Sequence, residues 1–221
     1  MVRKIAALFA LVLTFSLAAM PVAAQDIDTS DLSEFGLESG YLRMYMADPS
    51  AGTASTDMLG VMVAGFQFDS EDTAADAFED FTCGFASGFM GVEDATDCAG
   101  LEDAGFTVNA DININDAPAI EILGESDING PTPTNLTAIQ DGDQIFMVIN
   151  LGDDSEGAND DLGGFLVDSE PSDAEVVFSD DGTSTGGFFD QLPQDGDPVI
   201  EGLMPMMDMD FMGSSSSTPA S

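Results

Sequence analysis

The sequence predicts an α+β fold, in which helices pack on one face of an antiparallel sheet. Three patterns lead to this prediction. Apolar and polar residues alternate strictly over residues 106–114, which is typical of a half-buried strand. The dipeptide Asp141-Gly142 separates two apolar runs and predicts a hairpin with a type I′ turn. Four phenylalanines between residues 78 and 89 recur at steps of three and four, as on one face of a helix.

The first half of the chain predicts two strands and a long helix. The apolar runs at residues 41–47 and 59–68 flank a cluster of turn residues, as in a hairpin. The helix is expected to begin after Ser70, because acidic residues in its first turn suit the positive end of the helix dipole. Gly91 is expected to end it. Its inner face would carry Ala74, Phe78, Phe81, Phe85 and Phe89.

The second half predicts four strands and a weaker helix. The strands are expected at residues 106–114, 119–123, 135–140 and 143–151. The helix would cover residues 155–167, and each of its two central glycines costs about 1 kcal/mol relative to alanine. Its inward residues would be Leu162, Phe165 and Leu166, and an edge strand could follow at 176–178. The expected order is β-β-α and then β-β-β-β-α, with one strong and one weak helix on one face of the sheet.

The chain divides into five expected segments. A basic start, an apolar run and small residues up to Ala24 are typical of a secretory signal peptide over residues 1–24. An uncleaved anchor is the alternative, but a membrane span needs about 20 apolar residues and this run is shorter. The protein is therefore expected to be secreted or periplasmic. The other segments are an acidic arm (25–40), an α+β domain (41–180), an irregular Met/Asp-rich segment (181–212) and a disordered serine-rich tail (213–221).

The charge of the chain excludes several classes of partner. Without residues 1–24 the chain keeps 42 carboxylates and one cation, Arg43, so its formal charge is −41. Such a surface should bind neither nucleic acid nor anionic membranes, because both require cationic groups. It should attract cations and repel itself, and salt should screen the repulsion. The excess of aspartate and the lack of lysine after residue 24 resemble proteins adapted to concentrated salt.

Cys83 and Cys98 are the two cysteines of the chain. In an exported protein an even number of cysteines favours a disulfide. The bridge would close a loop of about 16 residues and stabilise the fold by roughly 3 kcal/mol. A redox pair is the alternative, but the spacing is not C-x-x-C and no basic neighbour activates a thiol. The structural disulfide is therefore preferred.

The composition removes most enzyme classes. Without histidine, neither a Ser-His-Asp triad nor a Cys-His pair nor a His-ligated zinc site can form. Paired carboxylates, as in glycosidases, are still available, but 42 acids make such pairs unspecific. The chain also has no tryptophan and two tyrosines, whereas sugar sites usually use aromatic platforms. We therefore expect no enzymatic activity and keep a carboxylate-dependent hydrolase as an alternative.

Calcium suits a chain rich in carboxylates, because it takes about six to eight hard oxygen ligands. The densest acidic cluster lies around a glycine-containing turn and is the candidate site. It does not match the EF-hand pattern, and a solvated acidic surface is the alternative interpretation. The candidate calcium ligands are Asp153, Asp154, Glu156, Asp160 and Asp161.

Five methionines lie within nine residues near the C-terminus. Thioethers are soft ligands that select Cu(I). The run resembles the methionine-rich segments of exported copper-handling proteins, although it lacks the histidine that usually accompanies them. A docked apolar segment or a sacrificial oxidation target would explain the run as well. The candidate copper ligands are Met204, Met206, Met207, Met209 and Met212.

Taken together, these features predict an exported, highly acidic binding or interaction protein without catalytic activity. We expect salt or Ca²⁺ to stabilise it, and Ca²⁺ is the one cofactor that the composition suggests. Cations are its expected small partners, and a protein partner is not identified. Cu(I) binding through residues 204–212 and a carboxylate-dependent hydrolase are the alternatives.

Overall fold

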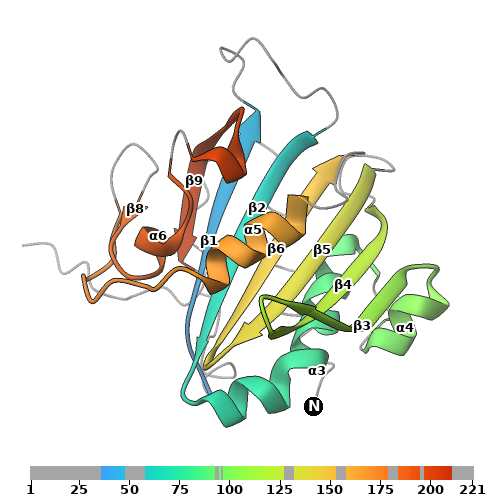
Figure 1. The fold of residues 1–221 in the computed structure, drawn as a ribbon. Helices are drawn as coiled ribbons and strands as arrows, with labels where there is room; N and C mark the ends of the chain where they lie inside the picture. The colour runs from blue at the N-terminus through green and yellow to red at the C-terminus, as the bar shows by residue number, and fades with distance from the viewer. Residues whose placement is uncertain are drawn as a thin grey trace, which may run out of the picture.

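The computed structural model describes residues 36–47, 58–92, 95, 97–126, 132–152, 158–178, 184–194 and 197–210. A seven-stranded sheet forms the centre of this described part, and helices cover it (Figure 1). In chain order the elements are β1 (Leu37–Ala47), β2 (Met58–Phe68), α3 (Glu71–Met90), α4 (Cys98–Asp103), β3 (Thr107–Ile114), β4 (Ala117–Ser126), β5 (Thr132–Asp141), β6 (Gln144–Gly152), α5 (Ala158–Val167), β7 (Val177–Phe178), β8 (Ser184–Thr185), α6 (Phe188–Gln191), the 3-10 helix η1 (Pro198–Ile200) and β9 (Leu203–Asp210).

The order of the strands in the sheet is β3-β4-β5-β6-β2-β1-β9, and each neighbouring pair is antiparallel. Strands β3 to β6 follow one another as a meander, and β2 joins the first hairpin to this meander through β6. Strand β9 returns near the end of the chain and pairs with β1 at the edge of the sheet. The predicted α+β class and antiparallel sheet are confirmed.

The two longest helices lie on opposite faces of the sheet, with α5 in front and α3 behind in Figure 1. Helix α3 packs on the face that contains Met62 and Met147. Helix α5 packs on the face that contains Val63 and Val148. Both helices were predicted to lie on one face of the sheet, and the structure corrects this detail. Residues 60–66 of β2 are all buried, so this strand needs cover on both of its faces.

Helix α3 begins and ends where the sequence predicts. Ser70 is its N-cap, and the side-chain oxygen accepts a hydrogen bond from the Thr73 amide at 3.2 Å. Gly91 is its C-cap with a φ of 76°, a left-handed conformation that favours glycine. The predicted phenylalanine face packs on the sheet, where Phe81 lies edge-to-face with Phe66 at a centroid distance of 4.8 Å.

The predicted disulfide between Cys83 and Cys98 is confirmed, with a Cα–Cα distance of 5.1 Å. Cys83 lies in α3 and belongs to the core on that face of the sheet. Cys98 begins α4, a short helix in which Leu101 is the one buried residue. The disulfide therefore attaches α4, which has little buried apolar surface of its own, to α3. A structural disulfide also indicates an oxidising compartment.

The hairpin turn between β5 and β6 differs from the predicted type I′ turn at Asp141-Gly142. Asp141 belongs to β5 and pairs with the first residue of β6, so the turn residues are Gly142 and Asp143. Gly142 has a φ of 56° and Asp143 has a negative φ, which is the sign pattern of a type II′ turn. The type I′ pattern occurs instead between β3 and β4, where Asn115 and Asp116 have φ values of 48° and 69°.

Regular structure also occurs in the segment that was predicted to be irregular (181–212). It contains α6, η1 and β9, and β9 completes one edge of the sheet. A bulge at Met206 interrupts the alternation of β9, so no clear period is visible in the sequence. Residues 176–178 were predicted as an edge strand of the main sheet. Strand β7 instead pairs with β8 in a separate two-stranded sheet.

Several element boundaries also differ from the predictions. Strand β1 begins at Leu37, inside the predicted acidic arm, and β4 and β5 are longer than predicted at both ends. The described part of α5 begins at Ala158, and residues 155–157, where the helix was predicted to begin, lie outside the described residues. The predicted signal peptide (1–24) and serine-rich tail (213–221) lie outside the described residues. Of the helices that the structure describes, none has the length and apolar character that a membrane crossing requires.

Replacing both cysteines with alanine should lower the free energy of unfolding by about 3 kcal/mol, because the unfolded chain regains the entropy that the bridge removes. Urea unfolding of the wild type and of the Cys83→Ala/Cys98→Ala variant measures this difference. A reductant should destabilise the wild type by a similar amount and leave the variant unchanged. Equal midpoints for wild type and variant would contradict the structural role of the bridge.

Candidate functional site

The structure describes part of the predicted calcium cluster. Asp160 and Asp161 occupy the first turn of α5 and are exposed. Asp153, Asp154 and Glu156 lie outside the described residues. Within the residues that are described, no three acidic or cysteine side chains form a group that could hold a metal ion. Calcium binding at this cluster stays a prediction.

Four of the five predicted copper ligands lie on the edge strand β9. They are Met204, Met206, Met207 and Met209, whereas Met212 lies outside the described residues. Met206 is the extra residue of the bulge and is 46% exposed. Met209 is half-buried and packs against the core beneath α3. The strand therefore holds these thioethers in fixed positions at the edge of the sheet.

Strand pairing brings two further methionines to β9 that the sequence analysis did not include. Met44 of β1 pairs with Met207, and Met46 of β1 pairs with Met204. Directly opposed residues of an antiparallel pair point to the same face, so these four side chains are neighbours. The Met-x-Met spacing of residues 44–46 was the one signal in the sequence that could have pointed to these two residues. Because β1 and β9 are about 160 residues apart in the sequence, their pairing was not predictable from it.

The opposite face of β1 carries Arg43, the one cation in the described part of the chain. Its Nε and Nη2 donate to the two carboxylate oxygens of Asp208 at 2.7 and 2.8 Å, and Nη2 also donates to the Ser184 carbonyl at 2.9 Å. The guanidinium lies over the Phe189 ring, 5.2 Å from its centroid. Burial lowers the pKa of Arg43, but the hydrogen bonds and charge of Asp208 outweigh it, and the pKa is raised.

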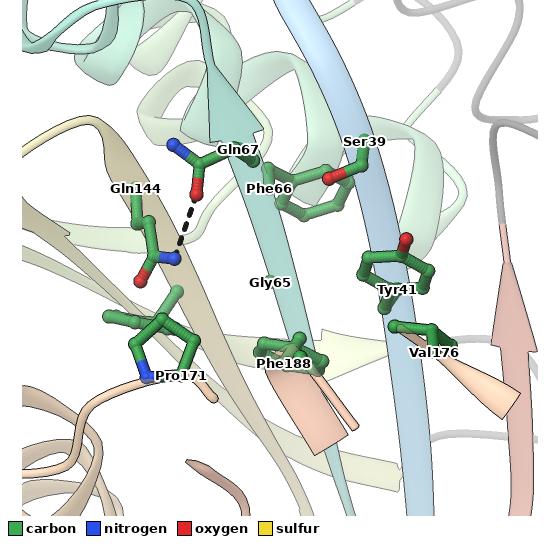
Figure 2. A pocket seen from close by; sticks show the side chains of 11 residues that line it. Ser39, Tyr41, Gly65, Phe66, Gln67, Gln144, Pro171, Val176 and Phe188 are labelled. Carbon is green, nitrogen blue, oxygen red and sulfur yellow. Dashed lines mark hydrogen bonds between the residues drawn. The ribbon is translucent and has the colours of Figure 1, made fainter. Parts of the chain in front are cut away.

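A pocket of about 220 Å³ lies on the same face as Arg43, between the sheet and the segment that follows α5 (Figure 2). Strands β1, β2 and β6 form one wall, and Pro171, Val176, Gly187 and Phe188 form the other. Several of these side chains come from positions far apart in the sequence. The sheet contributes Ser39, Tyr41, Gln67, Gln144 and Phe146, and the covering segment contributes Pro171, Val176 and Phe188.

Aromatic stacking shapes one wall of the pocket. The Phe188 ring is stacked on Tyr41 with a centroid distance of 5.9 Å and on Phe146 with a centroid distance of 6.4 Å. Phe188 lies directly against Gly65 of β2, where a Cβ atom would overlap the ring. Glycine at this position therefore lets the covering segment approach the sheet closely.

The polar groups of the pocket are two amides and two hydroxyls. Gln144 Nε2 donates to Gln67 Oε1 at 2.8 Å, as the dashed line in Figure 2 shows. This bond leaves the Gln144 amide oxygen as an acceptor for a ligand. Burial and then the charge of Asp210 raise the pKa of Tyr41, whereas a hydrogen bond with Ser39 lowers it. Because the net shift is upward, Tyr41 is a neutral hydroxyl at physiological pH.

The pocket provides hydrogen bonds but no acid–base pair, because Tyr41 is the one ionisable group in its lining. The carboxylates with shifted pKa values do not line it. The pKa of Asp141, beside the β5–β6 turn, is raised by burial and by the charge of Asp143. The pKa of Asp190 in α6 is lowered by hydrogen bonds, the largest effect coming from Ser172.

Comparison with known proteins gives no further assignment. No protein-family model, curated protein or solved structure matches this chain. The pocket, the buried ion pair and the methionines of β1 and β9 are the features of the described structure that bear on function.

Removing one member of the buried ion pair should be strongly destabilising. Arg43→Met leaves the Asp208 carboxylate buried without its partner, and the free energy of unfolding should fall by about 3–5 kcal/mol. The double variant Arg43→Met/Asp208→Leu should recover most of this loss, because apolar replacements of a buried pair are often tolerated.

Urea unfolding at constant salt measures these differences. Glu102→Gln, which neutralises an exposed carboxylate, is the control and should change the stability by less than about 0.5 kcal/mol. Arg43→Met with the stability of the wild type would show that the pair contributes nothing to the fold.

Proposed function

We propose that the protein is an exported, non-enzymatic binding protein, and that its ligand occupies the pocket lined by Tyr41, Gln144 and Phe188. The observation that supports this proposal is the composition of the lining, which combines stacked aromatic rings with neutral amides and hydroxyls. Small-molecule sites usually have mainly apolar walls and a few polar groups that orient the ligand.

The size and charge of the pocket restrict the ligand. A volume of about 220 Å³ is smaller than the roughly 300–1,000 Å³ of sites for drug-sized molecules. The strongly negative protein repels anions. The Gln144 amide oxygen accepts a hydrogen bond, and the Tyr41 hydroxyl both donates and accepts. We therefore expect a small, neutral, mainly apolar ligand with one or two hydrogen-bonding groups.

Two observations favour binding over catalysis in this proposal. The chain has no histidine, and the pocket lining has no carboxylate that could act as a general base. A carboxylate-dependent hydrolase would need a buried and an exposed carboxyl group together in a pocket.

Export is supported by the Cys83–Cys98 disulfide, and the signal peptide is part of the proposal.

Stabilisation by cations is also part of the proposal. The chain has 42 carboxylates and three basic side chains, so most of its negative charge has no positive side chain to balance it. Mutual repulsion of these charges opposes the compact state, and dissolved cations reduce it. A calcium site at Asp160 and Asp161 would add specific binding to this general effect.

Replacing Gln144 with leucine should weaken the binding of phenol by about 2- to 10-fold, because one hydrogen bond contributes about 0.5–1.5 kcal/mol. Toluene has a similar shape without the hydroxyl, and its affinity should not fall. Gln140→Leu is the matched control, because Gln140 is an amide that bonds to the Gly142 carbonyl outside the pocket.

NMR titration, observed at the amides of Gly65 and Gly187, measures these affinities. Shifts that are absent at both glycines for both probes, or an equal loss of phenol affinity in the two variants, would contradict the proposed pocket.

Sodium chloride at about 3 M should raise the thermal midpoint of residues 25–221 relative to about 0.1 M, because the Debye length falls from about 10 Å to less than about 3 Å. Circular dichroism measures the midpoints. Millimolar CaCl₂ should raise the midpoint further if the acidic cluster binds the ion, and MgCl₂ at the same concentration controls for ionic strength. Equal midpoints in all solutions would contradict stabilisation by cations.

A further inference from the structure

Methionines form a row across three strands at the β1–β9 edge, on the face of the sheet that carries α3. Met62 of β2 pairs with Met44 of β1, and Met44 pairs with Met207 of β9. Met62 belongs to the core beneath α3 and Met44 packs against it, which identifies the face. Helix α3 covers β2, β4, β5 and β6, so the row begins under the helix and extends beyond it.

A second row lies beside the first. Gly60 of β2 pairs with Met46 of β1, and Met46 pairs with Met204 of β9. A Cβ atom at Gly60 would lie 3.9 Å from Met46 Cγ, so the Met46 side chain leans over the glycine. Five of the six positions in the two rows are therefore methionine, and the sixth has no side chain.

Four of these methionines can direct their sulfur atoms to one point. We call Met44, Met46, Met204 and Met207 the methionine quartet. Paired residues have Cβ atoms about 4.5–5.5 Å apart, and Met44 and Met46, as alternate residues of β1, are about 7 Å apart. A methionine side chain has three rotatable bonds. The four thioethers can therefore surround one ion without movement of the backbone.

The quartet is accessible to an ion from solvent. Met46 is 44% exposed and Met207 is 37% exposed, while Met44 and Met204 are half-buried. Met62 is buried and lies beside Met44 on the neighbouring strand. Methionines that served as core packing alone would gain most by full burial. Here part of the thioether surface remains in contact with water.

The composition of the chain leaves no histidine and no free cysteine to compete with thioethers for a soft ion. The chain has no histidine, and Cys83 and Cys98 are joined in the disulfide. Thioethers select Cu(I), whereas carboxylates and carbonyls suit hard ions such as Ca²⁺ and Mg²⁺. Asp208 points to the opposite face, where it binds Arg43. The negative charge of the whole protein raises the local concentration of any cation.

We propose that the methionine quartet binds one Cu(I) ion through its four thioether sulfurs. The ion binds and leaves as Cu(I), so no electron transfer is involved. The quartet lies on the face of the sheet opposite to the pocket. Failure of either proposal therefore leaves the other unaffected.

The test titrates the full chain without its signal peptide with Ag(I), a soft monovalent ion that is stable in air. Nitrate salts replace chloride to keep the silver in solution, and the methionine methyl groups are followed by NMR. One equivalent should shift the methyl signals of the quartet and leave those of Met90 and Met147 unchanged. Shifts that do not saturate, or that spread over all methionines, would overturn the proposal.

Variants then test the ligands with Cu(I) itself, in competition with a coloured Cu(I) chelator under anaerobic conditions. M46L/M204L should weaken binding by at least about 30-fold, because two ligands are lost and no carboxylate replaces them at a soft ion. M90L/M147L is the matched control and should bind as the wild type does. Leucine nearly conserves the volume of methionine, and circular dichroism verifies that both variants fold.

Two results of the Cu(I) competition would overturn the proposal. One is equal affinity of M46L/M204L and the wild type. The other is loss of binding in a variant of Met206 and Met209 while M46L/M204L still binds, which would place the ion on β9 outside the quartet.

Discussion

The buried ion pair between Arg43 and Asp208 joins three separate parts of the chain to one strand. The Arg43 guanidinium of β1 donates hydrogen bonds to Asp208 of β9 and to the Ser184 carbonyl of β8. It also lies over the ring of Phe189 in α6. A buried pair contributes little net stability, because desolvation of the two charges offsets their attraction. We infer that its main effect is to fix which segments meet. Both candidate sites depend on this contact, since α6 supplies a wall of the pocket and β9 supplies half of the quartet.

Stability has to come from apolar burial, because the charges of the surface oppose folding. The central strands β2 and β6 are buried on both faces, against α3 on one side and against α5, α6 and η1 on the other. Polar contacts in this interior are specific. The Asn159 side chain donates to the carbonyls of Asn135 and Val148, both at 3.3 Å, and so ties the start of α5 to β5 and β6. The carboxylates can then lie at the surface, where water and salt screen them.

Local patterns of the sequence were sufficient to predict α3, the disulfide and most strands. The N-cap Ser70, the phenylalanine period and Gly91 all lie within one helix, so no distant contact is needed to recognise it. The face on which each helix packs was not predictable in the same way, because apolar runs such as residues 60–66 have no polar side. The pocket was missed because its lining comes from β1, β2, β6 and the segment after α5. Calcium binding by the acidic cluster stays a prediction, because Asp153, Asp154 and Glu156 lie outside the described residues.

The bulge at Met206 determines to which face of the sheet each side chain of β9 points. Met204 and Met207 are three residues apart and would point to opposite faces in a regular strand. The extra residue between them restores both to the face of Met44 and Met46. It also leaves Leu203 in the core on the α5 side and Asp208 opposite Arg43. The bulge at Met206 makes β9 difficult to recognise in the sequence. The same bulge allows residues of the quartet and of the ion pair to lie on one strand.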